Sequence, residues 1–270
     1  MALERSKVVA SQDTAHGVGH DYVKGSPHLR HDRLRHMVED RLAQLVRATI
    51  ERDGSCHVLE IGAGHGTFTD ALIAAGARVT VTEASAASAE LLTSRYADVD
   101  AVEVYYDTSG ESVFDLDRAF DAVSCIALMH HIPDYVSFAR RLATMIRPHG
   151  WFYCAQDPTY YPRRSWLTRI LDRGTYFVWR LAQGEVRRGL ATRWRRLRGE
   201  WSETEESDLV EYHVVRDGVD ELALAGALEE LFDDVDLFTY WSTQSPVLQR
   251  LFQRLDPPSE FGIAATGRRG

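Results

Sequence analysis

The sequence is poor in three features that mark whole classes of proteins. It has no run of about 18 apolar residues, which a membrane-spanning helix needs, and its first residues lack the apolar segment of a secretory signal. It has only three cysteines, an odd number without metal-like spacing, which argues against a closed disulfide framework. We therefore expect buried thiols, a cytoplasmic protein and no membrane span.

An excess of positive charge is also lacking. The formal net charge is −9 at pH 7, from 31 basic and 40 acidic residues. Binding to a polyanion needs a basic surface, so we expect no nucleic-acid partner. With 270 residues, 44% of them hydrophobic and 26% charged, the chain can form a packed globular fold of one or two domains.

Short β-like runs alternate with helical stretches along most of the chain. Parallel neighbouring strands need a crossover connection, so this alternation predicts a doubly wound α/β fold, a seven-stranded, mostly parallel Rossmann-like sheet. The strands are expected near 56–61, 78–83, 101–106, 120–128, 151–155, 235–240 and 260–266. The helices are expected near 34–50, 67–75, 85–96, 135–146, 218–231 and 246–254.

The same pattern divides the chain into four parts. Residues 1–50 form an N-terminal lid segment and helix, 51–159 a cofactor-binding core, 160–210 a helical cap insertion, and 211–270 the rest of the core with the last two strands. Within the insertion, residues 163–200 carry 11 arginines against three acidic residues. This basic stretch fits a cap with a solvated face, a site for an anionic acceptor, or attachment to a membrane surface.

A glycine-rich segment follows the first predicted strand. Gly62, Gly64 and Gly66 come directly after Val58–Ile61 and open a helix, so the backbone can approach a ligand beside helix N–H groups. The next strand ends at Glu83, whose carboxylate can accept both ribose hydroxyl protons, and the third ends at Asp107. Because ligands of open α/β sheets bind beyond the carboxyl ends of the strands, this pattern predicts a nucleotide-like ligand there.

These motifs resemble those of the class I S-adenosylmethionine-dependent methyltransferases of the small-molecule type, over about residues 56–157. The stretch from Ala119 to Asp134 and the turn Arg147–Gly150 match as well, with His149 where many relatives carry a second glycine. The resemblance implies S-adenosylmethionine as the cofactor and S-adenosylhomocysteine as the product.

The resemblance also implies where the cofactor lies. Glu60 and the glycine loop would contact its methionine moiety, Glu83 its ribose, and Asp107 the adenine amino group. Tyr22 is a candidate lid over the cofactor, although a loosely packed terminus fits equally well. The predicted cofactor residues are Tyr22, Glu60, Gly62, Ala63, Gly64, Gly66, Glu83, Ala84, Asp107, Thr108 and Met129.

A nicotinamide dinucleotide is the competing ligand, because a glycine loop with a distal acid is also its fingerprint. That fingerprint is G-x-G-x-x-G, whereas this chain reads G-x-G-x-G with Glu60 in front. The spacing therefore favours the sulfonium cofactor over an oxidoreductase.

Two histidines follow the fourth predicted strand. A hydroxyl acceptor needs a base to take its proton, and histidine titrates closest to neutrality, so His130 and His131 are the candidate catalytic residues. A structural role in the loop is the alternative for both.

The acceptor site is expected to be apolar and aromatic with a few polar groups. The candidate residues are His28, Asp157, Tyr160, Trp166, Tyr176 and Trp179. The segment Asp157–Tyr160 superficially resembles a D-P-P-Y motif of amino-directed methyltransferases, but it follows the fifth strand instead of the fourth. The histidines near the N-terminus lack the carboxylate or cysteine spacing of a metal site, so we expect no metal.

The sequence therefore predicts S-adenosylmethionine-dependent O-methylation of a small-molecule hydroxyl or carboxyl. An anionic acceptor, or one bound to a carrier protein, is compatible with the basic insertion. Carbon or nitrogen methylation, and a non-methylating activity such as a cyclase on the same cofactor fold, stay open. Release of S-adenosylhomocysteine separates methyl transfer from a non-methylating reaction. The identity of the acceptor and the oligomeric state are not readable from the sequence.

Overall fold

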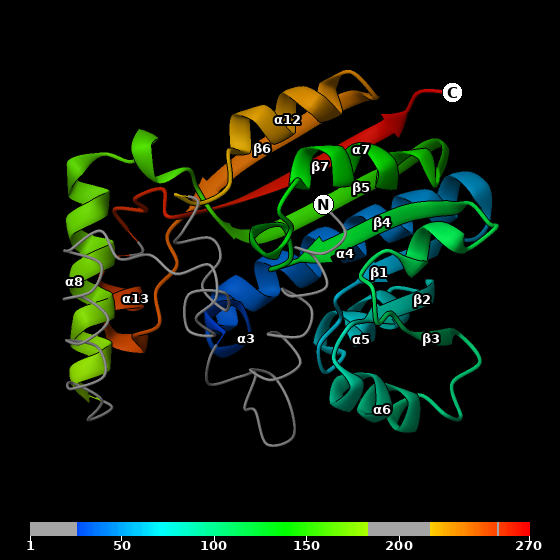
Figure 1. The fold of residues 1–270 in the computed structure, drawn as a ribbon, viewed down its shortest axis with the longest axis horizontal. Coiled ribbons are helices and arrows are strands. Elements are labelled where there is room, and N and C mark those ends of the chain that lie inside the picture. The colour runs from blue at the N-terminus through cyan, green and yellow to red at the C-terminus, as the bar shows by residue number, and fades with distance from the viewer. Residues whose placement is uncertain (1–25, 183–216, 253) are drawn as a thin grey trace.

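The computed structural model describes residues 26–182, 217–252 and 254–270, and these residues form one seven-stranded sheet. The strand order is β3-β2-β1-β4-β5-β7-β6, with β7 antiparallel to both of its neighbours and the other pairs parallel. The strands are β1 (His57–Ile61), β2 (Arg78–Glu83), β3 (Val102–Tyr106), β4 (Phe120–Ile126), β5 (Ile146–Pro158), β6 (Phe232–Tyr240) and β7 (Glu260–Arg268) (Figure 1). The order reverses direction between β1 and β4, which is where an open α/β sheet forms its ligand crevice.

Helices connect most of the strands. The α-helices are α3 (Pro27–Arg30), α4 (Asp32–Asp53), α5 (Thr67–Ala74), α6 (Ala86–Arg95), α7 (Tyr135–Thr144), α8 (Trp166–Ala182), α12 (Glu221–Glu229) and α13 (Pro246–Phe252). Short 3-10 turns are η1 (Ser112–Asp115), η2 (Met129–His131) and η3 (Tyr161–Arg163). Side-chain caps satisfy free backbone donors at several helix starts. Asp134, for example, accepts from Ser137 N–H before α7, and Asp220 from Ala223 N–H before α12.

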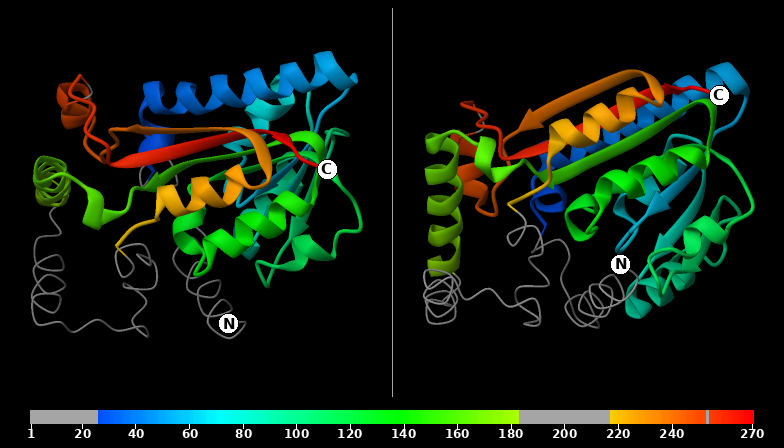
Figure 2. Two further views of the ribbon diagram at one scale, coloured as in Figure 1. Left: turned by 90° about the horizontal axis from the view of Figure 1, so that it is seen from above. Right: turned by 45° about the horizontal axis from the view of Figure 1, so that its top comes forward.

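Each face of the sheet has its own hydrophobic layer. One layer joins the sheet to α7 and α12 through residues such as Leu142 and Leu228. The other joins it to α4, α5 and α6 through residues such as Leu42, Leu72 and Leu92. Figure 2 shows α4 on the opposite side of the sheet from α7 and α12. Burial on both faces explains why the central strands read as continuous apolar runs.

The predicted fold is confirmed: a doubly wound, mostly parallel sheet of seven strands near the predicted places. The largest difference is β5, which begins at Ile146 instead of 151. The turn through Arg147–Gly150 is part of the strand, and His149 adopts φ 66°, a left-handed conformation that glycine adopts more readily. The departure from the glycine turn of the relatives is therefore accommodated in the backbone.

Parts of the predicted domain division lie outside the described residues. These are most of the lid segment, including Tyr22, residues 183–210 of the insertion, and residues 211–216 of the last part. The helix α8 is the described helix of that insertion. The division into four parts stays a prediction. All three cysteines, Cys56, Cys125 and Cys154, are buried free thiols, as predicted. In the described part of the chain, no helix combines the length and apolarity needed to cross a bilayer.

Candidate active site

Buried acidic side chains gather where the first three strands end. Glu60 lies in β1, Glu83 ends β2, and Asp107 directly follows β3. All three are less than a tenth exposed. Since β1, β2 and β3 are parallel neighbours, their carboxyl ends meet at one edge of the sheet and bring the predicted acids together.

The glycine loop adopts the backbone conformation that the sequence predicts. Gly62, Gly64 and Gly66 have φ of 72°, 57° and 84°, the left-handed region that disfavours residues with a Cβ. A Cβ on Gly66 would stand 2.5 Å from the hydroxyl oxygen of Tyr96, which donates to the Gly66 carbonyl. The loop therefore depends on glycine both for its conformation and for its packing.

The Glu83 carboxylate is fixed by the loop. It accepts hydrogen bonds from the backbone N–H of Gly64, at 2.8 Å, and of Ser85, at 2.9 Å. One backbone donor lies in the loop and the other precedes α6, so the carboxylate joins the ends of two neighbouring strands. Ser85 was not among the predicted residues, because it contacts Glu83 through its backbone N–H and not through its side chain.

Asp107 is held in a different way. Its Oδ1 accepts from the backbone N–H and the hydroxyl of both Ser109 and Ser112, at 2.7–3.2 Å. Its Oδ2 makes no hydrogen bond within the described residues, which leaves one oxygen for a donor such as an adenine amino group. Of its predicted neighbours, Thr108 is exposed and Ala84 is half-buried.

Glu60 lies under the loop and accepts a 2.6 Å hydrogen bond from the hydroxyl of Thr69, in α5. Burial raises the pKa of Glu60 to about 7, and the Thr69 hydrogen bond opposes this shift only in part. Glu60 is therefore a carboxyl group that a cationic ligand would convert to the ionised form.

A histidine and an aspartate pair beside this crevice. The Asp157 side chain is fully buried, and its Oδ1 lies 2.7 Å from Nδ1 of His130 and accepts the His130 backbone N–H at 3.0 Å. Since the carboxylate accepts the Nδ1 proton, Nε2 of a neutral His130 is left with the lone pair. This arrangement leaves His130 able to accept a proton.

Two strained residues direct the members of this pair. Ala127 has φ 53° and its N–H bonds the Ala155 carbonyl, where β4 turns into η2 and His130. Gln156 has φ 67° at an irregularity in the pairing of β5 with β7, directly before Asp157. Left-handed conformations of non-glycine residues cost about 1–3 kcal/mol and cluster at functional sites. Alanine and glutamine do not usually adopt a left-handed conformation, so their types in the sequence do not predict it. The contact between His130 and Asp157 was therefore not predicted.

The ring of His131 lies 3.9 Å from that of His130, between centroids. His28, in α3, is buried with its ring stacked on Phe68 at the start of α5. Three of the predicted histidines thus lie near the carboxyl ends of β1 and β4. In the part of the chain that the structure describes, no group of three or more His, Cys, Asp or Glu side chains could hold a metal ion.

Five further predicted residues lie in η2, after β5 and in α8. Met129 is fully buried in the hydrophobic layer beneath η2, and Tyr160 is half-buried with the Arg163 guanidinium over its ring. Trp166 is 73% exposed at the start of α8. Tyr176 and Trp179 belong to α8, but their side chains are outside the description. The ligand contacts of all these residues stay predictions.

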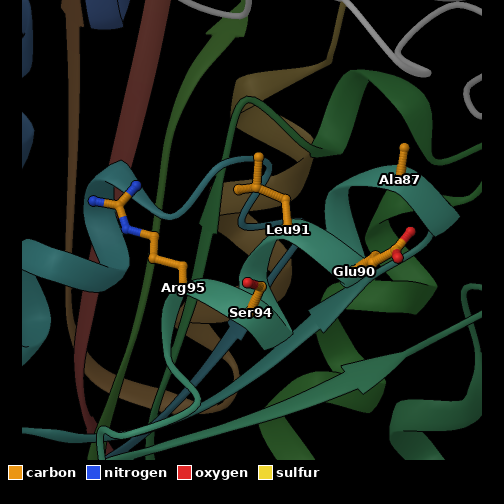
Figure 3. A pocket seen from close by; sticks show the side chains of 5 residues that line it. All are labelled: Ala87, Glu90, Leu91, Ser94 and Arg95. Atoms are coloured by element: carbon orange, nitrogen blue, oxygen red, sulfur yellow. The ribbon is translucent and has the colours of Figure 1, made fainter.

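A shallow, open hollow also occurs on α6, lined by Ala87, Glu90, Leu91, Ser94 and Arg95 (Figure 3). All five residues come from one helix face, away from the paired His130 and Asp157. The hollow offers no convergent catalytic groups, so the candidate active site remains at the strand ends.

Comparisons with known proteins bear on the family and the fold of the chain. The sequence model of a family described as "Methyltransferase domain" matches residues 29–204. A ubiquinone biosynthesis O-methyltransferase from Albidiferax ferrireducens is 30% identical over 103 residues, which cover 36% of this chain and 39% of that protein. One from Paracidovorax citrulli is 29% identical over 98 residues, with 36% and 41% covered. The chain thus aligns with about two fifths of the length of these curated relatives.

Solved structures share the fold at low sequence identity. The N-methyltransferase NodS of Bradyrhizobium japonicum, in complex with S-adenosylhomocysteine, is 13% identical with a TM-score of 0.52 over 97% of this chain and 98% of that one. The plantazolicin methyltransferase BpumL, also in complex with S-adenosylhomocysteine, is 10% identical with a TM-score of 0.51, covering 98% and 96%. At these identities the likeness concerns the fold alone.

Proposed function

The chain belongs to the methyltransferase-domain family, and on that premise we propose that it transfers the methyl group of S-adenosylmethionine to a hydroxyl or carboxyl oxygen of a small molecule. The observation that carries the oxygen acceptor is the pair formed by His130 and the buried Asp157. A hydroxyl nucleophile has a proton to lose, and this pair can take it, whereas a carboxyl acceptor is already ionised at neutral pH and needs no base.

The residues at the strand ends fit the cofactor. The left-handed glycines open the backbone of the loop where a Cβ would intrude, and Glu83 is a buried carboxylate with fixed orientation for two ribose hydroxyls. Asp107 keeps one oxygen for the adenine amino group, and Glu60 suits the ammonium of the methionine moiety. When bound there, the cofactor supplies a methyl group on a sulfonium, which is already a strong electrophile.

The protein's own part is to align the nucleophile and take its proton. Proximity and orientation alone can supply about 7–11 kcal/mol of the lowering of the barrier. Nε2 of His130 would take the proton of a hydroxyl acceptor as its oxygen is methylated. S-adenosylhomocysteine would leave with the electron pair of the broken carbon–sulfur bond. The Asp157 carboxylate stabilises the imidazolium that forms and holds the ring in the required tautomer.

The position of the acceptor and the compartment of the reaction also belong to this proposal. The half-buried Tyr160 and α8 lie on the polypeptide directly after Asp157, so a small molecule between them and His130 would meet the base. We place the reaction in the cytoplasm, since the three free thiols suit a reducing compartment.

The test is methyl transfer by variants of the pair. The protein is incubated with S-adenosylmethionine and a panel of phenols, sugars and carboxylic acids, and release of S-adenosylhomocysteine is measured. His130→Ala and Asp157→Asn should lower kcat by about 10²–10⁴, because each removes base catalysis, while calorimetry shows S-adenosylhomocysteine affinity within twofold of wild type. His36→Ala, an exposed histidine of α4, serves as the control.

Two outcomes would contradict the proposal. Equal kcat in wild type and His130→Ala removes the base role of His130. Conversion of an acceptor without release of S-adenosylhomocysteine identifies a non-methylating reaction on the same fold.

A further inference from the structure

His28 is a buried imidazole with an unsatisfied nitrogen. It is 8% exposed, its ring stacks on Phe68 with centroids 6.0 Å apart, and its Nδ1 has no hydrogen-bond partner among the described residues. A buried polar atom without a partner costs about 1–3 kcal/mol. A ligand bound beside the ring would supply the missing hydrogen bond.

The position of His28 places that ligand beside the reacting groups. Its helix, α3, lies beyond the carboxyl ends of the central strands (Figure 1), and Phe68 belongs to the first turn of the helix that follows the glycine loop. Burial, together with a smaller effect of positive charge on His130, lowers the pKa of His28 to about 3. The two imidazoles are therefore electrostatic neighbours.

The two histidines have different chemistry. His130 donates its Nδ1 proton to the Asp157 carboxylate, whereas His28 is neutral throughout the physiological pH range because burial lowers its pKa. A neutral imidazole offers a hydrogen bond and no charge. A phosphate or carboxylate at His28 would gain no ion pair from this ring, and burying its charge there would be costly.

We propose that His28 determines acceptor specificity: its imidazole hydrogen-bonds an uncharged polar group of the acceptor next to the oxygen that is methylated. This inference rests on the proposed function, and it narrows the substrate class. The acceptor is an uncharged molecule with a hydroxyl or carbonyl adjacent to the reacting oxygen, and not an anionic or phosphorylated one.

The experiment is nuclear magnetic resonance of ¹⁵N-histidine-labelled protein, read between pH 5 and 8. It is done first with the free protein, then with saturating S-adenosylhomocysteine, and then with two further probes. Salicylamide and salicylate have the same size and both place an oxygen beside a phenol hydroxyl, but only salicylate is anionic. His28→Asn keeps a polar group at the position of Nδ1, His28→Phe keeps a ring that can stack on Phe68, and His36→Asn is the matched surface control.

The expected result has three parts. The His28 nitrogens show a neutral ring down to pH 5, change little with S-adenosylhomocysteine, and shift with salicylamide. Salicylamide binds the protein saturated with S-adenosylhomocysteine at least fivefold more tightly than salicylate. This preference disappears in His28→Phe and is retained in part in His28→Asn, with His36→Asn unchanged.

Several results would overturn the inference. They are a His28 that titrates near pH 6.5, a large shift of its nitrogens with S-adenosylhomocysteine alone, no shift with either probe, or a preference for salicylamide that survives in His28→Phe. Failure of S-adenosylhomocysteine to bind the wild-type protein is a separate outcome, because it removes the proposed function as well as this inference.

Discussion

Glu60 carries the clearest pH dependence at the scale of single residues. Its carboxyl is buried, with a pKa raised to about 7 by that burial, so in the free protein it becomes protonated as the pH falls below 7. Binding of a ligand ammonium needs the carboxylate. The affinity for S-adenosylhomocysteine should therefore fall as the pH decreases from 7, by up to tenfold per pH unit.

Glu60→Gln should remove this dependence, because the amide keeps a carbonyl oxygen for the Thr69 hydroxyl and does not titrate. Calorimetry between pH 5.5 and 8 gives both profiles, with Glu90→Gln, on the exposed face of α6, as the control. Parallel profiles for Glu60→Gln and wild type would show that Glu60 does not face the ammonium.

Residues at the ends of strands were predictable because strand periodicity fixes where a strand stops. Glu83 and Asp107 were found in this way, and the structure buries both at the sheet edge. The contact between Asp157 and His130 was not predictable, since it joins residues 27 positions apart through two strained conformations. The sequence analysis predicted Asp157 only as a residue of the acceptor site.

The connection from β1 to α5 carries a prediction at the scale of elements. Gly66 caps α5 with φ 84°, and an added Cβ would collide with the Tyr96 hydroxyl. Gly66→Ala should lower the free energy of unfolding by about 1–3 kcal/mol and weaken S-adenosylhomocysteine binding. Denaturant unfolding and calorimetry measure the two effects.

Gly226→Ala is the matched control for this substitution. Gly226 lies inside α12 with a negative φ and open space where its Cβ would stand. Its replacement should raise the free energy of unfolding by about 0.5–1 kcal/mol, because alanine loses less conformational freedom in a helix. Equal effects of the two substitutions would contradict the strained role of Gly66.

Elements with strong periodicity were predicted to within a few residues. Examples are α4, α7 and the central strands, whose apolar residues pack on both layers of the sheet. The start of β5 was misplaced because a left-handed His149 continues the strand through what the sequence presents as a turn. A left-handed histidine of this kind depends on the neighbouring strand, and the residue type alone does not predict it.

At the scale of the whole molecule, the fold class followed from the alternation of strands and helices, since parallel neighbours require crossovers. The order of the strands did not follow from that alternation. It places β1 beside β4 and inserts β7 between β5 and β6, and such pairings depend on contacts between distant segments. This order brings the acids of β1 to β3 next to the histidines after β4 and forms the proposed site.

The central claim is that the glycine loop and Glu83 together bind an adenosyl sulfonium compound. The most direct measurement is isothermal calorimetry with S-adenosylhomocysteine and with NAD, on wild type, Glu83→Gln and the exposed control Glu90→Gln. We predict one S-adenosylhomocysteine per chain, no binding of NAD, and a loss of about 1.5–3 kcal/mol, roughly 10–200-fold in affinity, in Glu83→Gln alone. Binding of NAD in place of S-adenosylhomocysteine, or unchanged affinity in Glu83→Gln, would contradict the account.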